Sequence, residues 1–380
     1  MIRVLFFLCI TAQQPASPPP PKRTVELTGA VLMNAFYNSA RTNNSDAPTF
    51  ADSDAVGVKG SSATLRQTRL GVIVTDPDVL GGSFNGEIDL DFFGGQQPAA
   101  GNRTFPLVRL RRAIATVQWA HLQLMLGQEA PLVAERNPHS LASIGVPDFT
   151  SAGNLWLWIP QLRLTAEYGY TLRLAVQGAV LAPIAGVQGL TTTQADSGER
   201  TSRPSLEGRV RLAWGPADDP SEVALGGHIG WLRGLDSLSG DSLLTSHALT
   251  FDTRLKFGRA ELLGEAFVGQ AVAGLGGGAI GQNNGAGGVP VRTTGGWVQL
   301  NLRPRAGWMF GGGCGVDDPK DADVPATGRF RNLVCEGHVE WRPPGGGPLV
   351  FGFEFRRLET RYQAGDFVVN HLNLAAGYRF

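Results

Sequence analysis

Apolar and polar residues alternate along most of this chain with a period of two. The clearest example is FNGEIDLDF, in which Phe84, Ile88 and Leu90 share one face and Glu87 and Asp89 share the other. Successive side chains of an extended strand point to opposite faces, so this spacing predicts a strand with one apolar and one polar face. Similar segments recur along the rest of the chain, and their count predicts about sixteen strands.

The chain also ends on such a strand. VNHLNLAAGYRF runs to the last residue and places Leu372, Leu374, Tyr378 and Phe380 on one face. Chain termini usually fray, so a patterned strand that ends on an aromatic residue favours a terminus that is paired and meets lipid. This ending is similar to the closing strand of bacterial outer-membrane barrels. The alternative is the last strand of a soluble domain.

Long connections alternate with short ones. Short turns such as GPADDP contrast with the loops 94–105, 183–204 and 272–293. A transmembrane barrel has this rhythm, with short periplasmic turns, long external loops and an even number of strands of about 9–11 residues. The predicted fold is therefore all-β: a transmembrane antiparallel β-barrel of about sixteen strands over residues 25–380. A barrel of that size encloses an aqueous lumen.

Composition excludes several other classes of protein. With 17% charged residues and 51 Gly, the chain is neither a disordered polyelectrolyte nor a typical helical protein. It contains no run of eighteen apolar residues, which excludes a helical membrane span. The formal net charge is zero, so the chain shows no nucleic-acid footprint.

The N-terminal residues have the pattern of an export signal. Arg3, a short apolar run and Ala12 predict a signal peptide over residues 1–12. Residues 13–24 form a Pro-rich spacer, which we expect to be extended and unpaired. We therefore expect export to the outer membrane of a Gram-negative cell.

Tryptophan placement adds to the barrel interpretation. The eight tryptophans lie near predicted strand ends, where barrels carry aromatic girdles at the membrane interfaces. They are Trp119, Trp156, Trp158, Trp214, Trp231, Trp297, Trp308 and Trp341.

Two cysteines remain if Cys9 leaves with the signal peptide. An oxidising compartment allows Cys314 and Cys335 to form a disulfide. Their predicted strand positions look mismatched in height, which favours two isolated small apolar side chains instead. The sequence leaves both alternatives open.

With these segments in view, the chain resembles Gram-negative porins, and more closely the DcaP-like trimeric porins. The resemblance rests on the order and spacing of RQTRLGVIVT, DFFGG, RLRRA, LMLGQ, AGNLWLWIPQLRL and the closing GYRF. It implies a sixteen-stranded homotrimeric pore that passes small anionic solutes, often dicarboxylates. Family members often carry a charged helical segment before the barrel, and the resemblance does not extend to it, because SPPPPKR stands there.

The connection 129–154 is the candidate constriction. In porins the third external loop folds into the lumen, and this connection is long for a bare surface loop. Its mixture of apolar residues such as Leu132 and Phe149 with charged residues suits partial burial inside a barrel. The alternative is an external loop packed on the barrel rim.

The predicted wall is rich in arginine, and arginine is costly on a face that meets lipid. Guanidinium groups along a narrow aqueous path favour carboxylate or phosphate. We therefore expect passive diffusion of small hydrophilic solutes with a preference for anions such as carboxylates; near-neutral general diffusion and cation preference are the alternatives. Arg109 and Arg111 share one face by parity and Arg112 takes the other, which leaves that register unresolved. The expected pore-lining and constriction residues are Arg66, Arg109, Arg111, Arg163, Arg173, Arg209, Arg211, Glu87, Asp89, Glu135 and Asp148.

The sequence contains no GxSxG, HExxH or Walker motif. We expect no catalytic residues, cofactor or metal. The expected partners are outer-membrane lipid and lipopolysaccharide, small anionic solutes and two further copies of the chain. A barrel-type hydrolase is a second hypothesis, although His228 and His247 have no evident serine partner. A surface-binding protein with a plugged lumen is a third.

Overall fold

The computed structural model describes residues 22–54, 58–94, 106–186, 195–233 and 243–380, so the predicted signal peptide lies outside the described residues. Seventeen strands form one sheet. They are β1 (Thr24–Asn38), β2 (Gly60–Thr64), β3 (Arg69–Val79), β4 (Gly82–Asp91), β5 (Arg109–Gln118), β6 (Leu122–Glu129), β7 (Ile159–Tyr168), β8 (Leu172–Leu181), β9 (Ser205–Trp214), β10 (Ser221–Arg233), β11 (Leu243–Phe257), β12 (Ala260–Gln270), β13 (Arg292–Leu302), β14 (Trp308–Pro319), β15 (Arg331–Trp341), β16 (Leu349–Tyr362) and β17 (Gly365–Arg379). The helical turns are η1 (Glu199–Thr201), η2 (Ala273–Leu275), α1 (Gly278–Gly281), η3 (Ala286–Gly288) and η4 (Asp321–Asp323). Within the described part of the chain, no helix is long and apolar enough to cross a membrane.

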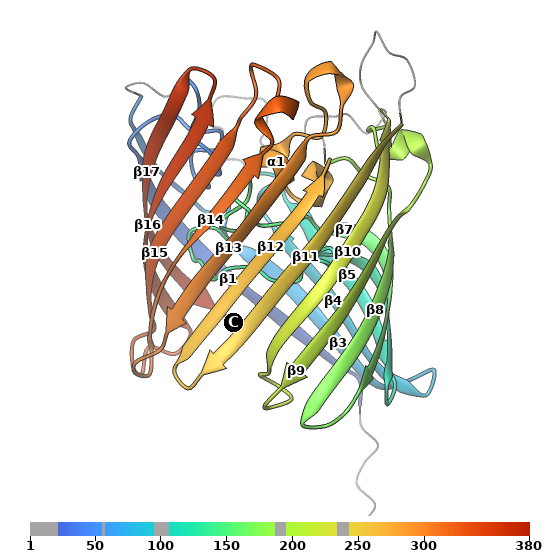
Figure 1. The fold of residues 1–380 in the computed structure, drawn as a ribbon. Coiled ribbons are helices and arrows are strands. Elements are labelled where there is room, and N and C mark those ends of the chain that lie inside the picture. Colours follow the sequence, from blue (N-terminus) through green and yellow to red (C-terminus); the bar gives the residue numbers. More distant parts are fainter. Residues whose placement is uncertain (1–21, 55–57, 95–105, 187–194, 234–242) are drawn as a thin grey trace, which may run out of the picture.

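The sheet closes on itself as a barrel (Figure 1). Neighbouring strands pair antiparallel, and β1 pairs with β17. Both β2 and β3 also pair with β1, β2 along Asn34–Asn38 and β3 along Thr24–Ala30. They are two halves of one strand position, so the barrel has sixteen positions. The predicted antiparallel barrel is confirmed.

Long connections lie at one end of the barrel and short turns at the other, as predicted, except for the two-residue connection between β16 and β17 at the end with the long loops (Figure 1). A two-residue turn joins β3 to β4 through Leu80 and Gly81, with φ of +56° and +73°. Left-handed backbone at both central residues matches the twist of an antiparallel hairpin, and glycine adopts it without strain. We call the two ends the turn end and the loop end.

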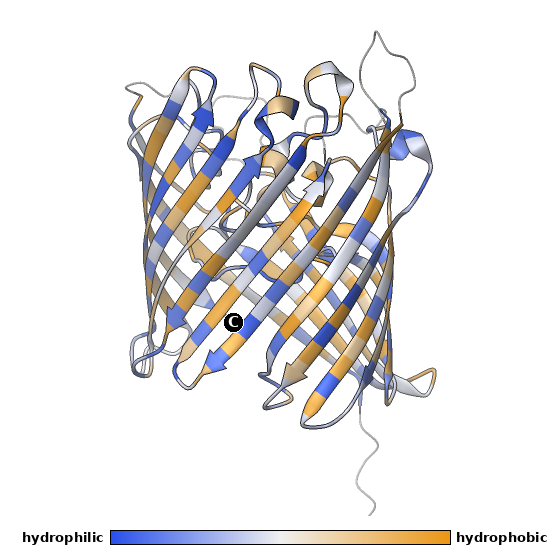
Figure 2. Ribbon diagram, in the orientation of Figure 1, coloured by the Kyte–Doolittle hydropathy of each residue, from blue (hydrophilic) through white to orange (hydrophobic). Residues whose placement is uncertain are grey.

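The barrel carries its apolar residues on the outside. In β8, Leu174 and Val176 are 47% and 55% exposed, whereas Ala175 and Gln177 between and after them are buried inside. The same alternation of hydrophobic and hydrophilic residues runs along the strands in Figure 2. Soluble proteins rarely expose such a continuous apolar surface, while a transmembrane barrel needs one to meet lipid.

The second strand position is interrupted between β2 and β3. Residues 65–68 leave the ladder, and the Thr68 hydroxyl accepts a hydrogen bond from the Leu32 N–H at 3.1 Å. The interruption turns the fully buried Gln67 side chain toward the lumen, where it contacts the loop described below.

A β-bulge in β5 resolves the arginine register that parity left open. Asp89 pairs with Arg112 and Leu90 pairs with Leu110, so Arg111 is an extra residue without a partner on β4. A bulge re-aims side chains beside it. Here it places Arg109, Arg111 and Arg112 together on the inner face, while Leu110 stays on the apolar outer face.

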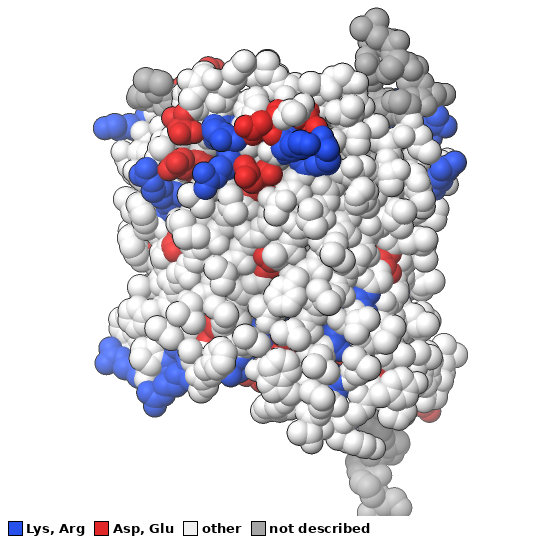
Figure 3. Space-filling model, viewed as in Figure 1, with Lys and Arg blue, Asp and Glu red and all other residues white. Residues whose placement is uncertain are grey.

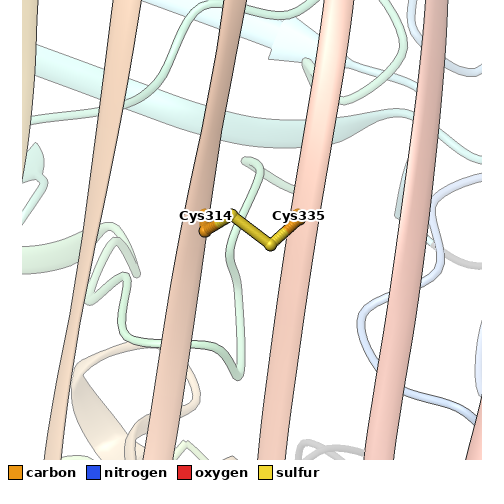
Figure 4. The surroundings of a disulfide bond; sticks show 2 residues. All are labelled: Cys314 and Cys335. Carbon is orange, nitrogen blue, oxygen red and sulfur yellow. A yellow bond between two sulfur atoms is a disulfide. The ribbon is translucent and has the colours of Figure 1, made fainter.

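The two cysteines form a disulfide between β14 and β15 (Figure 4). Cys314 and Cys335 are direct register partners, with Cα atoms 4.1 Å apart. The expected mismatch in height is wrong, because the pairing of Val316 with Leu333 brings the cysteines opposite each other. Both cysteines alternate with buried inward residues, so the bridge lies on the outer face.

The predicted aromatic girdle is wrong for three tryptophans. Trp156, Trp158 and Trp297 are 5%, 9% and 4% exposed and lie inside the barrel. Trp297 occupies an inward register position of β13, and the other two belong to the loop that enters the lumen. In contrast, Trp308 and Trp341 lie on the outer face at the turn end, with ring centroids 5.8 Å apart.

Candidate constriction site

The segment 130–158, which joins β6 to β7, folds into the lumen; we call it the inward loop. It is the segment expected to form the constriction, but it extends beyond residue 154. Residues 155–158 stay outside the barrel wall, and β7 begins at Ile159. The reason is that the N–H groups of Trp156 and Leu157 donate to the Leu275 carbonyl oxygen of η2 rather than to a neighbouring strand.

Wall side chains hold the first part of the inward loop by its backbone. The Glu207 carboxylate of β9 accepts from the Leu132 N–H at 2.6 Å. Across the lumen, the fully buried Gln299 amide of β13 both accepts from the His139 N–H at 2.8 Å and donates to its carbonyl oxygen at 2.9 Å. Loop backbone inside a barrel has no ladder partner, so wall side chains must satisfy it.

The next residues of the inward loop are held from β1 and from the interrupted strand position. The Asn34 amide donates to the Leu141 carbonyl oxygen at 2.9 Å. The Gln67 amide donates to the Ala142 carbonyl oxygen at 2.8 Å and accepts from the Ile144 and Gly145 N–H groups at 2.9 and 2.8 Å. The break between β2 and β3 is therefore a clamp for this loop.

The last part of the inward loop returns along the opposite wall. Phe149 stacks on Trp297 with centroids 5.8 Å apart, and the Asn332 amide donates to the Ser151 carbonyl oxygen at 2.8 Å. Gly153 has φ +97° and its Cα faces the Gly296 backbone so closely that any Cβ would clash with it. The inward loop is thus fixed at both walls and narrows the lumen between them.

A cavity of about 520 Å³ remains between the inward loop and the wall formed by β3, β5, β6, β7, β9 and β10. Six arginines and three glutamates supply its charge. They are Arg69, Arg111, Arg112, Arg136, Arg163, Arg211, Glu129, Glu135 and Glu222. The charged lining of this cavity is therefore dominated by guanidinium groups.

The bulge of β5 organises the first arginine cluster. Arg69 and Arg109 each hold an aspartate with two hydrogen bonds, Asp89 and Asp91 respectively. The Arg111 Nε lies between these pairs, 3.7 and 3.5 Å from the nearest oxygens of the two aspartates, and its guanidinium carbon lies 4.6 Å from the centroid of a Trp158 ring. A cation over an aromatic face is attracted to the ring quadrupole.

The second cluster ties the inward loop to β7, β9 and β11. Glu135 of the loop accepts from Arg163 at 2.5 Å and from Arg209 at 2.8 Å. Arg209 also binds Asp252 of β11 through two hydrogen bonds of 2.8 and 2.9 Å. Arg136 of the loop contacts the same aspartate at 3.2 Å. The cluster positions the loop and keeps its charges paired.

Burial separates the two signs of charge. Asp89, Asp91 and Asp252 are only 3%, 0% and 1% exposed, because they lie at the wall behind longer arginine side chains. The side chains of Arg69, Arg112 and Arg211, which line the cavity, are 35%, 25% and 23% exposed, so they are more accessible than these three aspartates.

A second cavity of about 460 Å³ follows at the turn end. It shares His139 and Ser140 with the first cavity, so the two lie on either side of the inward loop. Its charged lining consists of Arg303, Arg305, Arg342, Arg379 and Glu340. The excess of arginine thus continues beyond the constriction.

The structure places the expected site residues in different parts of the lumen. Arg111, Arg163, Arg211 and Glu135 line the constriction. Arg109, Arg209, Glu87 and Asp89 support that lining from the wall. Three others lie elsewhere: Arg66 binds Asp46 beneath a loop, Arg173 lies near the turn end, and Asp148 pairs with Arg356 on the opposite wall.

The sequence interpretation missed several lining residues. They are Arg69, Arg112, Arg136, Glu129, Glu222 and Trp158. Arg112 could not be found by parity, because a bulge breaks parity. Arg69 lies on the inner face beside the acidic residues of β4. The alternation of acidic residues in β4 is visible in the sequence, and it could have placed Arg69 in the lumen.

Ionised Glu135 stabilises the folded loop. Burial alone would raise the pKa of its carboxyl, but the Arg209 and Arg163 guanidinium groups outweigh burial and hold that pKa below its ordinary value of 4.5. For Asp148 burial dominates, and its pKa is raised well above the ordinary value in spite of Arg356. Folding therefore shifts the pKa values of these two carboxyls in opposite directions, downward for Glu135 and upward for Asp148.

Glu135→Gln is expected to lower the free energy of unfolding by about 3 kcal/mol at pH 7.5, since it removes one partner of a buried charged pair. A carboxyl whose pKa falls on folding stabilises the fold above its unfolded pKa and loses that contribution as pH falls through the folded value. The loss in free energy of unfolding that Glu135→Gln causes should therefore become smaller below pH 4.5. Urea unfolding in detergent at pH 7.5 and pH 3 measures it.

Glu359→Gln is the matched control, because Glu359 is 38% exposed and lies 3.7 Å from Arg357 on the outer face. Its loss should cost less than about 0.5 kcal/mol at either pH. An equal cost of Glu135→Gln at both pH values would contradict the assigned role of its charge.

Comparisons with known proteins agree on the fold. No known protein-family profile and no curated protein matches this sequence. Among solved structures, the chain is similar to the outer membrane channel DcaP of Acinetobacter baumannii, with a TM-score of 0.72 and 19% identity over 94% of this chain and 97% of that one. It is also similar to the anion-selective porin from Comamonas acidovorans (TM-score 0.61, 14% identity, 94% and 100% covered) and to the trimer form of OmpT from Vibrio cholerae (0.57, 9%, 95% and 100%). At these identities the likeness shows a porin-type barrel fold.

Proposed function

We propose that this chain is an outer-membrane porin through which small hydrophilic solutes diffuse passively, with a preference for anions such as carboxylates. The observation that carries the proposal is the constriction: a cavity beside an inward loop, lined by six arginines and three glutamates. The similarity to channels and to an anion-selective porin supports the same class of function.

The preference for anions follows from the distances between a solute in the cavity and the charged groups around it. The chain contains 33 basic and 33 acidic residues, so it has no net charge to attract anions from afar. At contact distance, however, the nearer member of an ion pair dominates, since the Coulomb energy falls with separation. A solute in the cavity approaches the accessible Arg69 or Arg112 more closely than the buried Asp89 or Asp252.

Under a KCl gradient across a planar bilayer, the full chain is expected to give a reversal potential with the sign of chloride preference. Because the field is local, the preference should weaken as ionic strength rises. Carboxylate solutes on one side should then reduce the chloride current. A potassium-selective current would overturn the anion preference, and absence of any conductance would overturn the porin proposal.

One group of residues resembles the side chains that a hydrolase needs, but the cavity beside it is too small for a substrate. The Glu207 carboxylate binds the His228 ring at 2.9 Å, and Ser205 lines the same small cavity as His228. That cavity measures about 10 Å³, which is the space of a single water molecule. The plugged-barrel alternative conflicts with the open cavity of about 520 Å³ beside the inward loop.

We propose a homotrimer in the outer membrane, with the turn end in the periplasm and the loop end outside. A trimer form of OmpT is among the similar structures, which supports this assembly. Mass measurement of the detergent-extracted protein tests it, and a monomer mass would contradict it.

A further inference from the structure

A histidine lies between two glutamates on the inner face of β15 and β16, and none of the three lines the arginine-rich cavity. Glu336 and His338 alternate on β15, and Glu354 of β16 is the register partner of His338. Their side chains are 0%, 5% and 3% exposed, in that order. One nitrogen or carboxylate oxygen from each of the three lies within 4.8 Å of the other two. They form a compact buried group, which we call the His338 cluster.

Carboxyl groups outnumber basic groups around the His338 cluster. On the outer face of the barrel, charged side chains gather near the two ends and few lie between them (Figure 3). On the inner face, in contrast, the Arg356 guanidinium serves two carboxyl groups: it donates to Glu354 at 2.6 Å and lies 2.6 Å from Asp148. Glu336 has no arginine or lysine partner among the described residues, and its ion-pair partner there is His338. A buried carboxylate is stable when it is paired or bound to a metal, so this wall can accept a further positive charge.

Two polar atoms beside the cluster lack partners. The Nε2 atom of His338 and the Oδ1 atom of the fully buried Asn301 form no hydrogen bond within the described residues. They face the same space, because a Cβ at Gly311 would lie 2.3 Å from the first atom and 2.4 Å from the second. The other ring nitrogen, Nδ1, lies 3.0 Å from a Glu336 carboxylate oxygen. When Nδ1 carries the ring proton, Nε2 and Oδ1 are two neighbouring acceptors and neither is satisfied.

A cation next to Nδ1 would satisfy both ends of the ring. With the proton on Nε2, the ring N–H lies beside the Asn301 carbonyl oxygen and the Nδ1 lone pair faces the carboxylates. A histidine that binds a metal usually donates its second N–H to such an oxygen. Two ligands of a tetrahedral zinc ion lie about 3.3 Å apart, close to the 3.0 Å between Nδ1 and the Glu336 oxygen. A cavity of about 10 Å³ beside His338 and Glu354 has the space for one further water ligand.

We propose that the His338 cluster binds a divalent transition-metal ion of the Zn²⁺ type through Glu336, His338 and Glu354. Zn²⁺ accepts imidazole nitrogen together with carboxylate oxygen, whereas Ca²⁺ and Mg²⁺ prefer oxygen ligands alone. Each carboxylate has about four acceptor positions, so its present hydrogen bonds leave a lone pair for the ion. The ligands form no sequence motif, because the register of β16 brings Glu354 to the other two, and the site replaces the expectation of no metal.

The ion would also fix the inward loop to β16. The Glu354 carboxylate accepts from the Ser140 hydroxyl at 2.6 Å. The same hydroxyl oxygen accepts from the Ala142 and Ser143 N–H groups at 3.0 and 2.9 Å. An ion that holds Glu354 therefore holds this part of the inward loop, and its expected effect is on the stability of the fold. The proposal goes beyond the porin function and does not depend on it.

The test uses the full chain in detergent after dialysis against a chelator, with isothermal titration of ZnCl₂. We expect one saturable Zn²⁺ site that MgCl₂ and CaCl₂ do not fill. His338→Gln should weaken Zn²⁺ affinity roughly 100-fold, because loss of an outer-shell partner alone typically costs about 10–100-fold. Asn301→Ala removes only the oxygen behind the ring and should weaken affinity about tenfold. At a Zn²⁺ concentration that saturates the wild-type chain, its urea midpoint should rise, and that of His338→Gln should not.

His228→Gln is the matched control. His228 is also buried, with Nδ1 2.9 Å from a Glu207 oxygen, but it belongs to no group of three such ligands within the described residues. This variant should bind Zn²⁺ like the wild type. Equal affinity of the wild type and His338→Gln, equal filling by MgCl₂, or absence of saturable Zn²⁺ binding would each refute the metal site. The wild-type urea midpoint in ZnCl₂ against MgCl₂ decides the question even if His338→Gln does not fold, since equal midpoints also refute the site.

Discussion

Gln67→Ala combined with Gln299→Ala is expected to release the inward loop and raise single-channel conductance by about twofold or more, because a sixteen-stranded barrel is otherwise an open aqueous channel. The two buried amides make five hydrogen bonds to the loop between His139 and Gly145. At about 1 kcal/mol each, their loss lowers the cost of lifting this segment by about 5 kcal/mol. Single-channel recording should show larger and noisier openings.

Gln123→Ala is the matched control for this effect. Its amide bonds Gln118 at 3.1 Å near the turn end and does not touch the inward loop. Conductance of this variant should equal that of the wild type. If the double variant also conducts like the wild type, then the loop is held by its other contacts and the clamp assigned to Gln67 and Gln299 is wrong.

The period of two was sufficient to predict the barrel, because the requirement for lipid outside and water inside acts on every strand. It failed where the backbone departs from regular pairing. The bulge at Arg111 brings Arg112 to the same face as Arg109, and alternation assigns it to the other. The break before Arg69 divides one strand position into β2 and β3. A bulge or a break is decided by contacts between strands, which a single strand's pattern does not contain.

Burial inside a lumen also looks unlike burial in an ordinary core. Trp297 sits at the end of an apolar-looking segment, yet it faces inward because Phe149 of the inward loop covers it. Trp158 was assigned to a membrane interface and instead lies over Arg111. The sequence predicted that a loop enters the lumen, but not the wall it rests against, and the surroundings of these tryptophans depend on that wall.

The wall amides show why a polar inner face is necessary for more than water. Asn34, Gln67, Gln299 and Asn332 are all fully buried, and each donates to a backbone carbonyl oxygen of the inward loop. An amide offers a donor and an acceptor together, which matches an irregular backbone segment better than a carboxylate does. Inward amides on several strands are therefore a sequence signal for a loop that enters the barrel.

Arg111→Glu is expected to convert the channel from anion preference to cation preference. Arg69 and Arg109 are each committed to an aspartate by two hydrogen bonds, whereas Nε and Nη1 of Arg111 make none within the described residues. Arg111 therefore carries the least compensated charge of the cluster. One unit charge at 4 Å changes the energy of an ion by about 1 kcal/mol in water, so a change of two charges should shift the chloride-to-potassium permeability ratio roughly tenfold or more.

Reversal potentials under a KCl gradient measure this shift, and Arg203→Glu is its control. Arg203 also lies near a tryptophan, 5.9 Å from the centroid of a Trp231 ring, but on the outer face of the barrel, so the same change of charge should leave selectivity unaltered. Arg111→Gln should produce about half the shift in free energy, because it removes one charge instead of two. This variant adds no carboxylate beside Asp89 and Asp91, so it decides the question even if Arg111→Glu does not fold. Unchanged selectivity in a folded Arg111→Gln channel would mean that the bulge arginine does not control ion passage, and that the lining contributed by the inward loop does.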